Sequence, residues 1–278
     1  ESANIRYAKE MQSQGIKLIF GSPNLKVHSK ICLIERLEGG NLKKYGFIST
    51  GNFNESTAKV YTDLTLFTSN SKILDEVSNV FNFFNANYKK YIFKNLFVSP
   101  INTESKIKKL IGNEIINAKS GKDAWIKIKI NNITSYSLIR SLYEASRAGV
   151  KIQMIVRGIC CLIPGHKNMS ENIEVISIVD RFLEHTRFMI FNNNGNCNTF
   201  ISSADWMTRN LDNRVEVTCP ILQDDLKNEI LDIFNIYWND NVKARHVNSS
   251  AKSIISKNNK MQSQQRIYNY YLNKIERI

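Results

Sequence analysis

Apolar and polar positions along the chain follow two periods, one typical of strands and one typical of helices. Short apolar or alternating runs predict strands. They cover residues 16–20, 25–34, 45–49, 60–67, 96–99, 125–130, 150–156, 173–176, the stretch around 185 that continues to 191, 199–203 and 215–219. Longer segments with apolar residues three or four positions apart predict helices at residues 2–14, 70–84, 103–120, 137–148, 225–238 and from 261 onward. Strands that alternate with helices indicate an α/β fold.

The predicted elements fall into two parts joined by an aperiodic segment. Residues 85–95 are polar and aromatic without a period, so we place a domain boundary there. In the first part, Asn70 is positioned to cap the helix that follows it. In the second part, residues 125–130 alternate isoleucine with lysine, which predicts a half-buried strand. A polar tail follows Val247. Both parts are expected to be α/β domains.

Two histidines stand in apolar strands, each with a cation two residues later. His28 is followed by Lys30, and His185 is followed by Arg187. Because every second side chain of a strand points to the same face, each pair lies side by side on a rigid element. An imidazole nitrogen can attack phosphorus, and a nearby cation can neutralise the non-bridging oxygens. A second histidine can donate or accept the proton of the leaving group. The pattern favours phosphoryl chemistry.

A polar loop and an acidic residue follow each histidine strand. The loops are Thr50–Asn54 and Ser202–Asp205, and the acids are Asp63 and Glu216. A carboxylate on the second imidazole nitrogen fixes the tautomer and offsets the positive charge that develops. We expect each acid to serve the histidine of its own half, Asp63 for His28 and Glu216 for His185. In each half, 12 residues also separate the start of a preceding strand from the histidine, so we interpret the halves as a diverged repeat.

Length, composition and charge narrow the class of protein. The 278 residues, 42% of them hydrophobic, are enough for one large or two ordinary domains with packed cores. A net charge of +13 favours a polyanionic partner such as nucleic acid, anionic lipid or polyphosphate. The 5 cysteines form no C-x-x-C pair and predict reduced thiols in a cytoplasmic protein without a zinc site. No apolar run reaches the roughly 18 residues of a membrane span. The chain begins at Glu1 inside a helical pattern, and we interpret it as a fragment.

These motifs resemble the phospholipase D superfamily and, within it, the polyphosphate kinases that are phosphorylated on histidine. H-x-K at 28–30 and G-N-x-N at 51–54 are similar to the superfamily motif, although Glu35 stands where an Asp is usual. The second copy has H-T-R at 185–187 and lacks the Gly of the loop element, which argues against an ordinary phosphodiesterase. The resemblance to polyphosphate kinases rests on longer stretches and covers all but the last 30 or so residues. These stretches are 25–30, 50–54, 61–63, 156–158, 177–185 and 202–210.

The resemblance implies reversible transfer of the terminal phosphate of ATP to inorganic polyphosphate, with Mg²⁺, through a phosphohistidine. It implies that residues 1–95 are the C-terminal part of a first phospholipase D-like domain, and that residues 96–278 are the second such domain with a helical tail. The candidate catalytic residues are His28, His185, Lys30, Asp63 and Glu216. The candidates for binding ATP or phosphate are Tyr61, Arg157, His185, Arg187, Arg214, Asn52 and Asn54. The metal ligands of the family are expected upstream of Glu1, so the metal site is unknown on this chain.

The expected partners are ATP or ADP and inorganic polyphosphate, with no nucleic acid and no membrane span. Peripheral membrane association is left open, and a homo-oligomer is expected for a full-length protein. We further expect cations near the motifs to line a path for polyphosphate; the candidates are Arg157, Arg187, Arg209 and Arg214. A phospholipase D-type phosphodiesterase or nuclease with paired histidines remains the alternative, and a non-catalytic polyanion-binding module is a third reading. Whether the fragment alone is active is also open.

Overall fold

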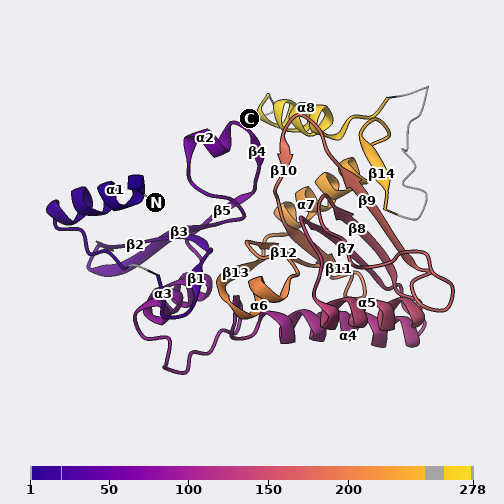
Figure 1. Ribbon diagram of the computed structural model, residues 1–278, viewed down its shortest axis with the longest axis horizontal. Helices are drawn as coiled ribbons and strands as arrows, with labels where there is room; N and C mark the ends of the chain where they lie inside the picture. The colour runs from indigo at the N-terminus through magenta and orange to yellow at the C-terminus, as the bar shows by residue number, and fades with distance from the viewer. Residues whose placement is uncertain (1, 20, 248–259, 277–278) are drawn as a thin grey trace.

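The computed structural model describes residues 2–19, 21–247 and 260–276 of the chain. Within these residues the strands form one nine-stranded sheet, one three-stranded sheet and one two-stranded sheet, with helices packed around them (Figure 1). The α/β class predicted from the alternating elements is therefore confirmed. The predicted tail lies mostly at 248–259, outside the described residues.

The first half of the chain forms the smaller part of the structure. Its elements are α1 (Ser2–Ser13), β1 (Lys26–Val27), β2 (Lys30–Glu38), β3 (Asn41–Ser49), α2 (Glu55–Ala58), β4 (Tyr61–Thr62), β5 (Thr65–Thr68) and α3 (Ser71–Asn85). Strands β2, β3 and β5 make the antiparallel three-stranded sheet, in the order β2-β3-β5. Helix α3 begins as predicted, because the side chain of Asn70 accepts a hydrogen bond from the backbone N–H of Ile73.

The second half forms most of the nine-stranded sheet. Its elements are β6 (Phe97–Ser99), α4 (Thr103–Lys119), β7 (Trp125–Ile130), α5 (Tyr136–Arg147), β8 (Lys151–Val156), β9 (Ile173–Ile178), β10 (Leu183–Glu184), β11 (Phe188–Phe191), β12 (Asn198–Ser202), α6 (Thr208–Asp212), β13 (Arg214–Ile221), α7 (Asp224–Trp238), β14 (Ala244–His246) and α8 (Ser263–Ile275). The sheet runs in the order β1-β13-β12-β11-β7-β8-β9-β14, and β6 pairs with β13 on the edge opposite β12.

Strand β7 is covered on both of its faces, whereas the sequence predicted that only one face is buried. Its isoleucines point into a core shared with α4 and α5. On the opposite face, Lys127 bonds to Asn235 of α7, and the Lys129 ammonium lies over the ring of Tyr237. Lys129 is only 1% exposed. The prediction of a half-buried strand is therefore wrong, because α7 packs over the lysine face.

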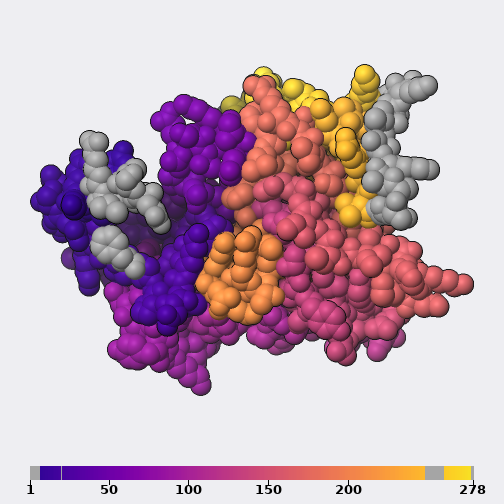
Figure 2. All heavy atoms as spheres, in the orientation of Figure 1, coloured from indigo at the N-terminus to yellow at the C-terminus, as the bar shows by residue number. Residues whose placement is uncertain are grey.

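One of the hydrophobic cores contains residues from both halves of the chain. It joins Ile48 of β3 and Val77 of α3 to Val217 of β13 and Phe234 of α7. Two short strands also cross between the halves: β1 extends the large sheet beside β13, and β10 pairs with β4 of the first half. In the space-filling view the purple residues of the first half lie against the salmon residues of the second, and below them indigo residues lie against orange ones (Figure 2). The halves are thus packed as one body.

Several predicted strands differ from the structure. Residues 16–19 form no strand, and Ile16 and Ile19 are exposed. The apolar run there has no neighbouring strand to pair with among the described residues, and Phe20 lies outside them. The predicted strands 25–34 and 60–67 are each interrupted, so they become β1 with β2 and β4 with β5. The short elements α2, α6 and β14 were not predicted, because they are too brief to show a period.

No helix in the described part of the chain combines the length and the apolar character that crossing a bilayer requires.

The segment between the halves is fixed by one buried carboxylate. Glu76 of α3 is 7% exposed, and its two oxygens accept hydrogen bonds from the backbone N–H groups of Lys94, Asn95 and Leu96 at 2.8–3.1 Å. The Asn95 side chain adds another bond at 2.9 Å. Several donors on one charged acceptor make this contact strong for its size.

We expect Glu76→Gln to destabilise the protein by about 1–3 kcal/mol, because an amide nitrogen then faces buried N–H donors. Urea unfolding should show this loss. The matched control is Asp75→Asn, which removes an exposed ion pair with Lys44 and should cost about 0–1 kcal/mol. Equal losses in the two variants would contradict this role of Glu76.

Candidate active site

His28 lies where the chain leaves one sheet and enters another. It follows β1 directly, and the backbone N–H groups of His28 and Ser29 both donate to the carbonyl oxygen of Val215 in β13. This parallel register, Val27 opposite Val215, brings His28 beside Glu216. The Nδ1 atom of His28 is 2.8 and 2.9 Å from the two carboxylate oxygens of Glu216, which is fully buried.

His185 has a matching arrangement with the halves reversed. It follows β10, whose residues Leu183 and Glu184 pair with Tyr61 and Thr62 of β4. The register places His185 beside Asp63, and its Nδ1 atom is 2.8 and 3.1 Å from the two carboxylate oxygens.

The expected assignment of the acids is therefore wrong and must be exchanged. Glu216 bonds to His28, and Asp63 bonds to His185, so each acid serves the histidine of the opposite half. The reason is that β1 and β10 each pair with a strand of the opposite half, which places each histidine beside the acid of that half. Both acids hold Nδ1, and this leaves Nε2 as the nitrogen with the free lone pair in the neutral ring.

Each acid is held in turn by a hydroxyl group from the polar loop of its own half. Thr50 donates to Asp63 at 2.6 Å, and Ser203 donates to Glu216 at 2.5 Å. The same hydroxyls accept from the next backbone N–H, at Leu64 and Val217 respectively. Sequence reasoning missed both residues as functional groups. The signal was their shared separation of 13 residues from the acid that follows.

Gly51 is required by the position of Asp63. A Cβ atom at residue 51 would lie 1.8 Å from the Oδ2 atom of Asp63, and this overlap leaves no room for any side chain. The glycine of the first loop thus permits the carboxylate to sit against the backbone. In the second loop the corresponding residue is Ala204, beside the longer Glu216 side chain.

The two cations fold back onto their own histidine segments. Lys30 is 8% exposed, and its ammonium donates to the carbonyl oxygen of His28. Arg187 is 4% exposed and donates through Nη1 to the carbonyl oxygen of His185 at 3.1 Å. Its Nε donates to Asp205 at 2.9 Å, so a carboxylate balances this guanidinium.

Burial controls the protonation of two groups in the site. Burial lowers the pKa of Lys30 to about 8, although the charge of Glu216 opposes this effect. Burial also lowers the pKa of His185, while its hydrogen bond to Asp63 opposes the shift and the charge of Arg187 adds to it. The Nη1 atom of Arg187 is 3.3 Å from the Nε2 atom of His185, so the two side chains meet at the reactive nitrogen.

The other predicted binding residues surround this pair in different ways. The ring of Tyr61 lies 5.1 Å from the His185 ring, measured between centroids. Arg157 is half-buried and uses Nε to donate to Asn131 at 2.7 Å and to the carbonyl of Glu184 at 2.5 Å. The Nη1 atom of Arg214 is 3.9 Å from Glu216.

Asn52 and Asn54 lie on the surface of the first loop. Asn54 caps α2, because its side-chain oxygen accepts from the backbone N–H of Thr57 at 3.0 Å. Both asparagines line a surface pocket of 510 Å³ together with Tyr61 and Asp63. Arg209, which was expected on a path for polyanions, is exposed on α6. The structure therefore brings the histidines, acids and nearest cations together, and leaves these three residues at the edge.

Comparison with known proteins gives the family. A family model described as polyphosphate kinase C-terminal domain 1 matches residues 1–90, and one described as C-terminal domain 2 matches residues 96–266. A polyphosphate kinase of Vibrio parahaemolyticus is 48% identical over 98% of this chain and 40% of its own length. The polyphosphate kinase of Escherichia coli K12 is 44% identical over 97% of this chain and 40% of its own length.

Solved structures agree with the family models. The crystal structure of polyphosphate kinase from Porphyromonas gingivalis superposes with a TM-score of 0.93 at 41% identity, covering 99% of this chain and 43% of that one. Phosphatidylserine synthase of Haemophilus influenzae reaches a TM-score of 0.50 at 10% identity over 84% of this chain and 67% of that one, which shows a shared fold alone. The chain spans about two fifths of the length of the curated relatives it matches. Since family models of both C-terminal domains match it and together cover most of its length, the chain belongs to the polyphosphate kinase family.

Proposed function

We propose that this chain carries the phosphoryl-transfer site of an ATP–polyphosphate phosphotransferase that works in both directions. The observation that supports this most is the pair of histidines, each bound at Nδ1 by a buried or partly buried carboxylate and each next to a cation. Phosphoryl transfer depends mainly on positioning and positive charge, and this arrangement supplies both. The relatives named polyphosphate kinase support the choice of substrate.

His28 is the proposed acceptor of the phosphoryl group. Its Nε2 lone pair forms the N–P bond while the bond from phosphorus to the ADP oxygen breaks, so ADP leaves. In the second step a terminal oxygen of polyphosphate attacks the same phosphorus, and the N–P bond breaks. Glu216 balances the positive charge of the phosphorylated ring. Lys30, which lies two residues away, is the proposed counter-charge for the phosphate oxygens.

His185 is the proposed partner of the leaving and entering groups. Asp63 keeps its Nδ1 protonated, so Nε2 can bind or exchange a proton at the phosphate oxygens. Arg187 lies against the same nitrogen and adds positive charge there. We assign Arg157, Arg214, Tyr61, Asn52 and Asn54 to binding of ATP or phosphate, with Arg157 best placed because only its Nε is bonded among the described residues.

The family kinases generally use Mg²⁺, and we propose the same cofactor here. The residues that the structure describes contain no group of three or more His, Cys, Asp or Glu side chains arranged to hold a metal ion. The roles given above belong to this chain's own side chains.

We also propose that residues 1–95 are the C-terminal part of a first phospholipase D-like domain and that 96–278 form the second. The meeting of the two family models between 90 and 96 supports this division. The five free thiols support a cytoplasmic location. A homo-oligomer without nucleic acid as a partner remains our expectation for the full-length protein.

The first prediction concerns the phosphorylated residue. In the full-length protein with γ-labelled ATP and Mg²⁺, His28→Ala should lose both the acid-labile label and polyphosphate synthesis, because the attacking nitrogen is gone. His166→Ala, at an exposed loop position, is the control and should behave as wild type. Label that persists in His28→Ala but disappears in His185→Ala would reverse the two roles. Hydrolysis of a phosphodiester without transfer from ATP would support the alternative activity instead.

A second prediction tests the exchanged acids. Glu216→Gln should slow the first labelling of His28 by a factor on the order of 10² to 10⁴, because the charge that stabilises the phosphorylated ring is lost. Asp63→Asn should slow this step less, since it acts through His185. Rapid-quench measurement of a single turnover gives both rates. A larger loss in Asp63→Asn would show that acids and histidines pair within each half in the working enzyme.

The third prediction uses the lowered pKa of Lys30. As pH rises through about 8, the ammonium loses its proton and the phosphate loses a counter-charge, so kcat/KM for ATP should fall above that pH. Lys30→Arg should move this alkaline limb upward, because arginine stays protonated. Lys26→Arg at an exposed position should leave the limb in place. If kcat/KM of Lys30→Arg still falls near pH 8, the fall comes from the titration of another group.

A further inference from the structure

The short strand that precedes His185 is paired along only one edge. β10 forms a two-residue ladder with β4, and within the described residues no other strand lies beside it. Leu183 donates toward β4, to the carbonyl of Val60. The backbone groups of Phe182 and Glu184 point to the opposite edge, where they need other partners if they are not to stay unpaired.

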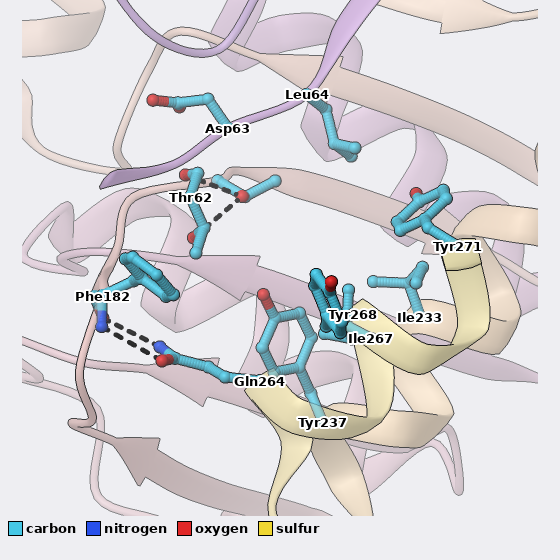
Figure 3. A pocket seen from close by; sticks show the side chains of 11 residues that line it. Thr62, Asp63, Leu64, Phe182, Ile233, Tyr237, Gln264, Ile267, Tyr268 and Tyr271 are labelled. Carbon is cyan, nitrogen blue, oxygen red and sulfur yellow. Dashed lines mark hydrogen bonds between the residues drawn. The ribbon is translucent and has the colours of Figure 1, made fainter. Parts of the chain in front are cut away.

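The side chain of Gln264, from α8, fills this second edge. The backbone N–H of Phe182 donates to Gln264 Oε1 at 3.0 Å, and Gln264 Nε2 donates to the Phe182 carbonyl at 2.9 Å (Figure 3). A primary amide offers one acceptor and a donor, as a backbone peptide does, so the side chain replaces one rung of a neighbouring strand. Nε2 also donates to the carboxylate of Glu184 at 2.7 Å.

Glu184 is the buried anchor of this contact. Its carboxylate lies 3.0 Å from the ammonium of Lys129 and accepts from the hydroxyl of Thr62 at 3.2 Å. The bond from the Thr62 hydroxyl to the Glu184 carboxylate therefore also joins β4 to β10, directly beside His185. Because Glu184 and Lys129 are both almost fully buried, the position of this carboxylate is fixed by the sheet behind it.

Helix α8 is itself fastened at both ends. At its start, the backbone N–H of Ser263 donates to Asp240 at 2.7 Å, and Gln262 donates to Asp180 at 2.6 Å. Further along, the hydroxyl of Tyr271 donates to Glu229 of α7 at 3.0 Å. The Cα of Gln264 is thus held relative to the core, and its amide can act as a fixed support.

A pocket and a set of hydrogen bonds both lie between α8 and the segment before His185. A pocket of 210 Å³ separates α8 from Thr62, Asp63 and Leu64, with Tyr268 and Tyr271 on its helix side (Figure 3). The bonds of Gln264 to Phe182 and Glu184 join α8 directly to β10 and to the residue before it.

We propose that Gln264 is a positioning residue for His185, holding β10 in register with β4 so that the imidazole stays on Asp63. This inference rests on the proposed function, in which His185 takes part in catalysis. The last helix then serves the active site without touching the substrate. Loss of the amide leaves the backbone N–H and carbonyl of Phe182 without this partner, weakens the hold on β10 and lets the ring drift from the carboxylate.

The test compares Gln264→Met with Gln265→Met in the full-length protein. Methionine keeps the length and helix preference of glutamine but makes none of the three bonds. Gln265 is exposed and its amide bonds only to Asn269, so it is the matched control. We expect Gln264→Met to lower kcat about tenfold while KM for ATP stays within about twofold, since misplacing a reacting group acts on the chemical step. The control should change neither value.

A second readout does not depend on activity. Hydrogen exchange at the imidazole C2 position, followed by mass spectrometry, reports the titration of each histidine. The groups around His185 are Asp63, Arg187, Lys30 and Tyr61, and Asp63 is the partner that raises its pKa. Gln264→Met should therefore lower the pKa of His185 further, while exchange at His28 stays as in wild type.

The outcomes separate the inference from the proposed function. If the full-length wild-type protein synthesises no polyphosphate, but Gln264→Met still lowers the pKa of His185, the proposed function is contradicted. The positioning role of Gln264 is then still supported. Unchanged exchange at His185, with kcat per folded molecule equal to the control, would overturn the positioning role. If Gln264→Met folds poorly, Gln264→Asn, which is one methylene too short to reach Phe182, serves in its place with the same two expected results.

Discussion

The bond between each histidine and an acid of the opposite half is the interaction on which the site depends. β1 pairs with β13, which carries Glu216, and β10 pairs with β4, which Asp63 directly follows, so neither half supplies a complete histidine–carboxylate pair. A shared hydrophobic core between α3, β3, β13 and α7 fixes the relative position of the halves. The orientation of both imidazoles therefore depends on the packing between the halves. A shift of one half relative to the other would misalign both rings.

The two halves are alike in backbone and hydroxyl support but differ in charge. Thr50 and Ser203 hold the acids in the same way. In the second half Asp205 neutralises Arg187, whereas Asn52 occupies the matching place in the first loop and brings no charge to Lys30. The ammonium beside His28 is therefore buried without a carboxylate of its own loop, and its pKa falls to about 8. This asymmetry fits a division of labour in which His28 accepts the phosphoryl group and His185 assists.

The sequence predicted the groups of the site better than their partners. The histidines, their cations and the polar loops stand in local patterns, and the structure brings these groups together. The pairing of acids was wrong because β1 and β10 are two residues long and show no period, so nothing local indicates that they leave their own half. Burial of Lys129 depends on α7, more than ninety residues later, and the support from Gln264 depends on a helix near the end of the described chain. Such long-range contacts are set by tertiary packing and leave no signal in a short window of sequence.

The most direct test of the exchanged pairing is amide hydrogen exchange of the two histidine segments in the acid variants. Weakening a charge-assisted bond should loosen the short strand that it holds, because local opening depends on few contacts there. Glu216→Gln is predicted to speed exchange in residues 26–29 and to leave residues 183–186 as in wild type, while Asp63→Asn should do the reverse. Faster exchange of 26–29 in Asp63→Asn, with 183–186 unchanged, would contradict the account.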